Sequence, residues 1–181
     1  MISVSEVFMK KLFLILGLLA VSSIIFAQNA GNKITFSSVD LNGNPVSSKL
    51  FAENKITMVN IWGTFCPPCI REMPDLGKLA NVNKANGVEI VGIPIDIIDG
   101  NGNLLTQENR DAKLIIKKTG ADYVHIVPTV DMLYGFLRNV QAVPTTIFVD
   151  SKGKQIGEAY LGARSRKDWQ KIIDDLLAAQ K

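Results

Sequence analysis

The sequence has 181 residues, of which 47% are hydrophobic and 20% are charged, and its formal net charge is +3. This composition is typical of a globular protein with one core, because single cores usually serve about 100–200 residues. The small net charge does not indicate a nucleic-acid-binding surface, so we expect no nucleic acid among the partners.

The amino-terminal segment departs from this average. Two lysines precede an apolar run at 12–27, and small residues lie near its end. This pattern is typical of an export signal. The run has 16 residues, whereas a membrane-spanning helix needs about 20 apolar residues. We therefore expect residues 1–27 to be a signal peptide or an uncleaved membrane anchor, and residues 28–181 to form one domain.

The first part of this domain predicts a hairpin, a strand and a helix. Two strand-like runs at 33–51 flank Asn42-Gly43-Asn44-Pro45, and an Asn-Gly pair favours a hairpin turn. A short apolar run at 55–63 suits a central strand that is buried on both faces. Apolar residues at helical spacing then predict a helix over 67–83.

Strands and helices continue to alternate along the rest of the chain. The further elements that we expect are a buried strand at 87–96, a polar loop at 99–103, a helix at 106–118, a short strand or extended segment at 122–128, a short helix at 131–139, strands at 144–150 and 154–162, and an amphipathic helix at 166–181. This order predicts an α/β fold with a mixed central sheet, in which chemistry gathers beyond the carboxyl ends of strands.

Both cysteines of the chain, Cys66 and Cys69, lie just past the first central strand, in the stretch WGTFCPPC. A catalytic cysteine must be a stabilised thiolate with access to solvent. Pro67 suits the first helical position and pushes Cys66 toward an extended N-cap conformation, at the positive end of the helix dipole. We therefore expect Cys66 to attack a substrate disulfide, and Cys69, which is close enough to form a disulfide with it, to resolve the mixed disulfide.

The two prolines between the cysteines also affect the chemistry of the pair. Pro67 and Pro68 have no backbone N–H to offer to the Cys66 sulfur. The amide of Cys69 is then the nearest candidate donor.

Other uses of the cysteine pair are weaker interpretations. A structural disulfide that closes so short a loop contributes little entropic stabilisation. A zinc site needs about four ligands, and the sequence has one histidine, His125. Copper binding by Cys66, Cys69 and His125 stays open, because soft sulfur ligands suit copper. Our leading expectation is redox exchange with neither a metal nor another cofactor.

The combination of WGTFCPPC, Pro74 and VPTT at 143–146 resembles the TlpA/ResA-like branch of exported thiol-disulfide oxidoreductases, over residues 33–177. The resemblance implies a thioredoxin-like fold with an amino-terminal β-hairpin. It implies a monomeric protein-disulfide reductase in the periplasm or at the outer face of the inner membrane. Its substrates would be disulfide-containing envelope proteins, including apocytochrome c, and its electrons would come from a membrane thiol reductant.

The same resemblance assigns roles to residues outside the cysteine pair. Pro144 is expected to be a cis-proline that faces the cysteines, which leaves the Val143 backbone free to pair with an extended substrate. Glu72 matches an acidic position of the ResA-like branch and is expected to accept the proton of Cys69. Asn60 replaces the buried aspartate of cytoplasmic thioredoxins and cannot act as a base.

The expected substrate surface consists of Trp62, Pro67, Pro68, Val143 and Pro144, with Trp62 as a packing and shielding residue rather than a reactant. Two other functions remain as alternatives. Copper chaperones of the Sco type carry a longer Cys-x-x-x-Cys motif and an added histidine. Thiol peroxidases have a threonine three residues before the attacking cysteine, where this chain has a glycine.

Overall fold

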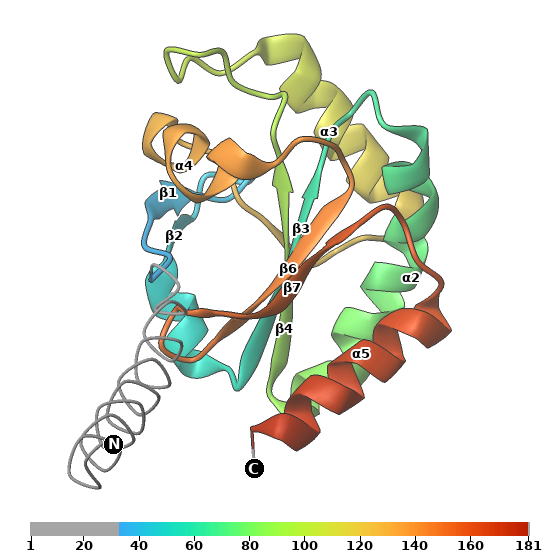
Figure 1. Ribbon diagram of the computed structural model, residues 1–181. Coiled ribbons are helices and arrows are strands. Elements are labelled where there is room, and N and C mark those ends of the chain that lie inside the picture. The colour runs from blue at the N-terminus through green and yellow to red at the C-terminus, as the bar shows by residue number, and fades with distance from the viewer. Residues whose placement is uncertain (1–32, 181) are drawn as a thin grey trace, which may run out of the picture. The chain divides into compact units, whose positions relative to one another are not determined.

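Figure 1 shows the computed structural model of the chain, which describes residues 33–180. The signal or anchor expected at 1–27 lies outside the described residues. Within 33–180, no helix has both the length and the apolar character needed to cross a membrane.

The centre of the fold is a five-stranded sheet in the order β5-β4-β3-β6-β7. Strand β3 (Ile56–Trp62) runs parallel to β4 (Val88–Pro94) and antiparallel to β6 (Thr145–Asp150). At the two edges, β4 pairs in parallel with the short β5 (Val124–His125), and β6 pairs in antiparallel with β7 (Gln155–Leu161). The expected mixed sheet is confirmed, and β3 lies at its centre.

The expected amino-terminal hairpin is also confirmed. Strands β1 (Ser37–Val39) and β2 (Pro45–Ser47) form a separate two-stranded antiparallel sheet. In the turn between them, the Asp40 carboxylate accepts hydrogen bonds from two backbone N–H groups, and Gly43 takes a φ of 89° that favours glycine. An antiparallel backbone bridge also joins Asp40 to Ile126, the residue after β5. The hairpin is therefore attached beside β5.

Helices cover both faces of the sheet (Figure 1). The elements on one face are α2 (Pro67–Asn83), α3 (Thr106–Thr119) and α5 (Arg166–Ala179); those on the other face are the 3-10 helix η2 (Ser48–Glu53), α4 (Val130–Tyr134) and η4 (Phe136–Asn139). A further short 3-10 helix, η3 (Lys84–Asn86), follows α2. The single helix expected at 131–139 is divided into α4 and η4 at Gly135.

The two faces of β3 carry two separate hydrophobic clusters, because successive side chains of a strand point to opposite sides. Met58 and Trp62 pack into the cluster under α2, α3 and α5, whereas Val59 and Ile61 pack into the cluster on the other face. Every residue of β3 is buried. This burial explains the nearly continuous apolar run in the sequence, and it holds the carboxyl end of β3 firmly beneath the cysteine turn.

Gly92 in β4 leaves room for two rings that pack against the sheet. A Cβ atom at this position would collide with Nδ1 of His125 and lie 3.1 Å from Nε1 of Trp62. Both rings are buried, so neither can move aside without disturbing the core.

We therefore expect Gly92→Ala to lower the free energy of unfolding by about 1–3 kcal/mol, the usual cost of overpacking a core. Urea denaturation of the purified protein measures this change. Gly100→Ala is a matched control, because a Cβ atom there meets nothing within 4 Å, and its effect should stay within about 0.5 kcal/mol. Equal effects of the two substitutions would contradict the packing argument.

Candidate active site

Cys66 is the N-cap residue of α2, directly beyond the carboxyl end of β3. Its backbone is extended (φ −103°, ψ 95°), and its sulfur accepts a hydrogen bond of 3.2 Å from the Cys69 backbone N–H. Pro67 follows at the first helical position, where its lack of an N–H is harmless. Cys66 and Cys69 form a disulfide with a Cα–Cα distance of 5.3 Å.

Both cysteines are largely covered in this disulfide form. Cys66 is 4% exposed and Cys69 is 0% exposed, so the solvent access expected for Cys66 is not present here. The cover includes Val143, whose carbonyl oxygen lies 3.5 Å from the Cys66 sulfur. This contact joins residues 77 positions apart, and no local sequence pattern reports it. Cys66 is nevertheless the more exposed member of the pair.

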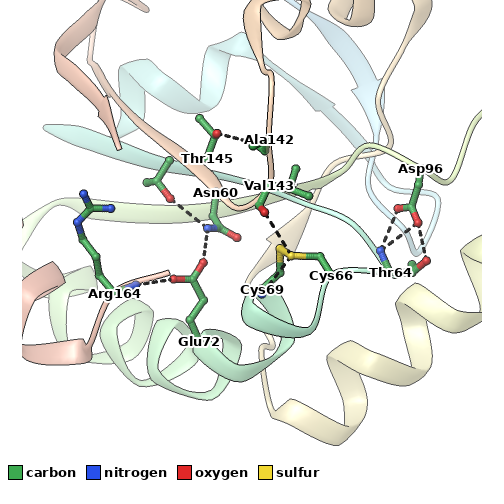
Figure 2. Close-up of a disulfide and its surroundings, with 11 residues drawn as sticks. Asn60, Thr64, Cys66, Cys69, Glu72, Asp96, Ala142, Val143, Thr145 and Arg164 are labelled. Atoms are coloured by element: carbon green, nitrogen blue, oxygen red, sulfur yellow. Dashed lines mark hydrogen bonds between the residues drawn. A yellow bond between two sulfur atoms is a disulfide. The ribbon is translucent and has the colours of Figure 1, made fainter. Parts of the chain in front are cut away.

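The segment opposite the disulfide enters β6 through a cis peptide bond between Val143 and Pro144. Two hydrogen bonds hold this segment: Gly162 N–H donates to the Pro144 carbonyl over 2.9 Å, and the Thr145 hydroxyl donates to the Ala142 carbonyl over 2.7 Å. Figure 2 shows the Val143 carbonyl directed at the disulfide. The cis bond therefore lies on a braced segment that faces the cysteine pair.

Glu72 lies on α2, one turn after Cys69, and its carboxylate is buried beneath the helix. Asn60 Nδ2 donates to Oε1 over 3.0 Å, while the Arg164 backbone N–H and the Trp169 indole N–H donate to Oε2 over 3.2 and 3.3 Å. Burial raises the pKa of Glu72 above the usual glutamate range, although these donors and the Arg164 charge act in the opposite direction. Glu72 therefore binds its proton more tightly than a surface glutamate.

Asn60 connects the central strands to this carboxylate. Its Nδ2 also donates to the Thr146 hydroxyl over 3.1 Å, and its Oδ1 has no hydrogen-bond partner among residues 33–180. Figure 2 shows the Asn60 amide beside the Glu72 carboxylate, on the side of the carboxylate that faces the disulfide. Asn60 therefore presents an N–H, rather than a second carboxylate, to Glu72.

The turn that leads into Cys66 is clamped to the neighbouring strand. The Asp96 carboxylate, just past β4, accepts hydrogen bonds of 3.1 and 3.0 Å from the Thr64 backbone N–H and a further one from the Thr64 hydroxyl (Figure 2). Cys66 N–H in turn donates to the Gly63 carbonyl over 3.1 Å. Sequence reasoning missed Asp96, because its partner lies 32 positions away.

Trp62 and His125 form an aromatic contact deep in the core. Trp62 is fully buried, which suits a packing role and leaves no surface for a substrate. Its ring makes a T-shaped contact with the His125 ring at a centroid distance of 5.7 Å, and His125 stacks on Tyr123 at 4.4 Å. His125 Nε2 pairs with the Ala121 carbonyl, and burial lowers the pKa of His125 to about 4, so the ring is neutral at physiological pH.

The copper alternative needs His125 beside both cysteines. Within 33–180, no group of three or more histidine, cysteine, aspartate or glutamate side chains is arranged to hold a metal ion. His125 instead packs against Tyr123 and Trp62. The described residues therefore offer no ligand set for that alternative.

The fold and the Cys-x-x-Cys turn together define a protein of the thioredoxin-like class. The Redoxin family matches residues 28–176. The chain is 33% identical over 124 residues to the thiol-disulfide oxidoreductase ResA of Bacillus thuringiensis subsp. konkukian, covering 68% of this chain and 64% of that protein. It is 30% identical to the thiol:disulfide interchange protein DsbE of Haemophilus influenzae, covering 75% and 68%.

Solved structures agree with these relatives. A thioredoxin-family thiol:disulfide interchange protein from Chlorobium tepidum superimposes with a TM-score of 0.68 at 26% identity, over 83% of this chain and 98% of that one. The chain belongs to the Redoxin family, and its ResA and DsbE relatives identify it as TlpA/ResA-like. It spans slightly less than two thirds of the length of the Bacillus relative, at 64%.

Pro68 occupies the second helical position, from which a backbone N–H often reaches the N-cap side chain. We expect Pro68→Ala and Pro68→Gly each to add such a donor and to favour the Cys66 thiolate. The midpoint of the pH profile for Cys66 alkylation in the reduced protein should fall by up to about one pH unit. Because alanine lacks the backbone freedom of glycine, a shift in both variants identifies the donor as the cause. An unchanged or raised midpoint in both would refute this account.

Proposed function

We propose that the chain is an exported thiol-disulfide oxidoreductase that reduces protein disulfides through Cys66 and Cys69. The observation that carries this proposal is the position of Cys66 at the N-cap of α2, where its sulfur accepts the Cys69 backbone N–H. This N–H and the helix dipole both stabilise negative charge on the Cys66 sulfur. Of the two sulfurs, Cys66 is therefore the better nucleophile.

The proposed reaction runs in two exchanges. The Cys66 thiolate attacks one sulfur of a substrate disulfide, which forms a mixed disulfide and releases the other substrate sulfur as a thiolate that takes up a proton. The Cys69 thiolate then attacks the Cys66 sulfur, which forms the Cys66–Cys69 disulfide and releases the second substrate sulfur as a thiolate that takes up a proton. A membrane thiol reductant supplies two electrons and two protons to regenerate the dithiol.

Glu72 is proposed to take the proton that Cys69 loses before the second exchange. It lies three positions after Cys69 on the same helix, so the two side chains leave neighbouring parts of the helix surface. The raised pKa of Glu72 brings its proton affinity closer to that of a thiol, which favours transfer between them. Asn60 holds the carboxylate but cannot itself accept the proton.

The substrate is proposed to bind as an extended segment along the half-buried Val143, with the buried Pro144 directly behind it. The braced cis segment lies against the Cys66 sulfur, and an extended peptide that pairs with the Val143 backbone would bring its own disulfide to that point. Pro67 is exposed and Pro68 is half-buried at the start of α2. These two prolines would form the other side of the contact.

The setting of the reaction is also part of the proposal. Residues 1–27 would act as a signal peptide or membrane anchor, and residues 28–181 would form the thioredoxin-like domain as a monomer. The place of action would be the periplasm or the outer face of the inner membrane. The names of the ResA and DsbE relatives, a thiol-disulfide oxidoreductase and a thiol:disulfide interchange protein, support disulfides as the substrate class. The proposed substrates are envelope proteins with disulfides, including apocytochrome c.

A trapping experiment tests the roles of the two cysteines. The reduced Cys69→Ser variant should accumulate a mixed disulfide between Cys66 and a model disulfide protein such as insulin, whereas Cys66→Ser should trap little. Mass spectrometry of the non-reduced complexes identifies the linked residues. A reduction potential near −270 mV would fit a reductase and one near −120 mV an oxidase. If both sulfurs of the reduced wild-type protein resist alkylation, the proposed function is wrong.

The pH dependence of the second exchange tests Glu72. Because its pKa is raised, the carboxyl is protonated and inactive as a base at low pH, and becomes a base only as the pH rises through that pKa. Near neutral pH, we expect Glu72→Gln to slow the second exchange by about 10²-fold or more, and at low pH to leave it unchanged. Stopped-flow measurement of resolution provides the rates.

Glu89 offers a matched control for this experiment. Burial also raises the pKa of Glu89. However, Glu89 pairs with Thr57 near the start of β4, whereas Trp62 and the cysteine turn lie at the other end of the β3–β4 pair. Glu89→Gln should therefore leave the pH profile unchanged. Equal profiles for Glu72→Gln and the wild type would remove Glu72 from the reaction.

A further inference from the structure

The buried carboxylate of Glu72 is held by a residue that lies far away in the sequence. The indole N–H of Trp169, in the first turn of α5, donates to Glu72 Oε2 over 3.3 Å, across a separation of 97 residues. We propose that Trp169 is the positioning residue of Glu72: its indole N–H holds the carboxylate in place and favours the ionised form. Its effect on catalysis rests on the proposed function, but its effect on Glu72 does not.

The indole of Trp169 is a rigid donor because aromatic rings enclose it. Trp169 is fully buried, its ring meets Tyr160 edge-on at 5.7 Å, and Phe148 lies at 6.3 Å. The Arg164 guanidinium lies over both the Tyr160 and Trp169 rings, at 4.9 and 5.2 Å from their centroids. The indole therefore cannot turn its N–H away from Glu72 without disturbing several neighbours.

The start of α5 supports the same geometry. The Ser165 hydroxyl caps α5 by accepting a hydrogen bond from the backbone N–H of Asp168, the residue before Trp169. The preceding residue, Arg164, donates its own backbone N–H to the same oxygen of Glu72 over 3.2 Å. One short segment thus supplies two of the three donors to the carboxylate.

The direction of the effect follows from the charge of the acceptor. An N–H donor binds a carboxylate more strongly than a neutral carboxyl group, so it opposes the effect of burial and lowers the proton affinity of Glu72. The loss of the Trp169 donor should therefore raise the pKa of Glu72. The resulting variant would need a higher pH before Glu72 could act as a base.

Few other groups can change charge close to Glu72. Arg164 faces it from the segment before α5, and its charge lowers the pKa of Glu72. Burial and the Glu72 charge raise the pKa of Tyr123 far above its usual range, so this phenol stays neutral. Asn60 and Thr146 on the sheet do not titrate. Cys69 on the same helix is held in the disulfide in the oxidised protein, so the oxidised form isolates the titration of Glu72.

The two tryptophans of the chain provide an experiment with an internal control. We would record the indole N–H signals of the ¹⁵N-labelled oxidised protein by NMR across a pH range. The Trp169 signal should titrate with a midpoint above the ordinary glutamate value of 4.5. The Trp62 indole has no partner among residues 33–180 and lies against His125, so it should respond only to that ring, near pH 4.

The Glu72→Gln variant identifies the group that titrates. In this variant, the Trp169 signal should stay constant with pH, while the Trp62 signal should behave as in the wild type. A Trp169 signal in the wild-type protein that ignores pH, or one that still titrates in Glu72→Gln, would overturn the proposal. These measurements use the folded, oxidised protein, and Glu72→Gln keeps the size of the buried side chain.

Kinetics of the reduced protein extend the test to function. Trp169→Phe removes the N–H and keeps an aromatic ring, and it should move the midpoint of the pH profile for the second exchange upward by about one pH unit. Tyr160→Phe, which changes a neighbouring ring without touching Glu72, should leave that midpoint unchanged. An unshifted midpoint in Trp169→Phe would contradict the proposal.

The outcomes separate this inference from the proposed function. A wild-type protein that reduces no disulfide, but in which the Trp169 signal follows Glu72, would refute the function and keep the positioning role. An active protein with a constant Trp169 signal would refute the positioning role alone.

Discussion

The structure depends on the point where β3 ends and α2 begins. Cys66 caps the helix, and its sulfur receives the Cys69 N–H, so the attacking group of the proposed reaction is also the group that satisfies the first turn of the helix. This arrangement needs a rigid support, and the fully buried strand β3 provides it. The Asp96 carboxylate secures the intervening turn through Thr64.

A second constraint is the burial of Glu72. A carboxylate in an apolar interior is costly unless donors surround it, and here β3, α5 and the segment before α5 each supply one. Burial still raises the pKa, so the residue keeps a high proton affinity without being left unsatisfied. The carboxyl-terminal helix therefore helps to hold the carboxylate that we propose as the proton acceptor of Cys69.

The sequence predicted most elements to within a residue or two, because periodicity, turn residues and helix caps are local signals. Where prediction and structure differ, tertiary contacts decide. In the segment expected at 122–128 as a short strand or extended segment, β5 covers Val124–His125, and Ile126 adds an isolated bridge to Asp40. The helix expected at 131–139 is divided at Gly135. The solvent access expected for Cys66 is absent in the disulfide form, because Val143 lies against its sulfur.

The sequence by itself determined the order of elements, the position of the cysteine pair at the start of a helix, and the likeness to thiol-disulfide oxidoreductases. All of these depend on residues that are neighbours in the chain. Only the tertiary structure decided the environment of Glu72. Trp169 lies 97 positions from Glu72, and Thr146 lies 86 positions from Asn60, which holds the carboxylate. A buried tryptophan in an amphipathic helix predicts a core position, and only the folded chain shows that its N–H faces a carboxylate.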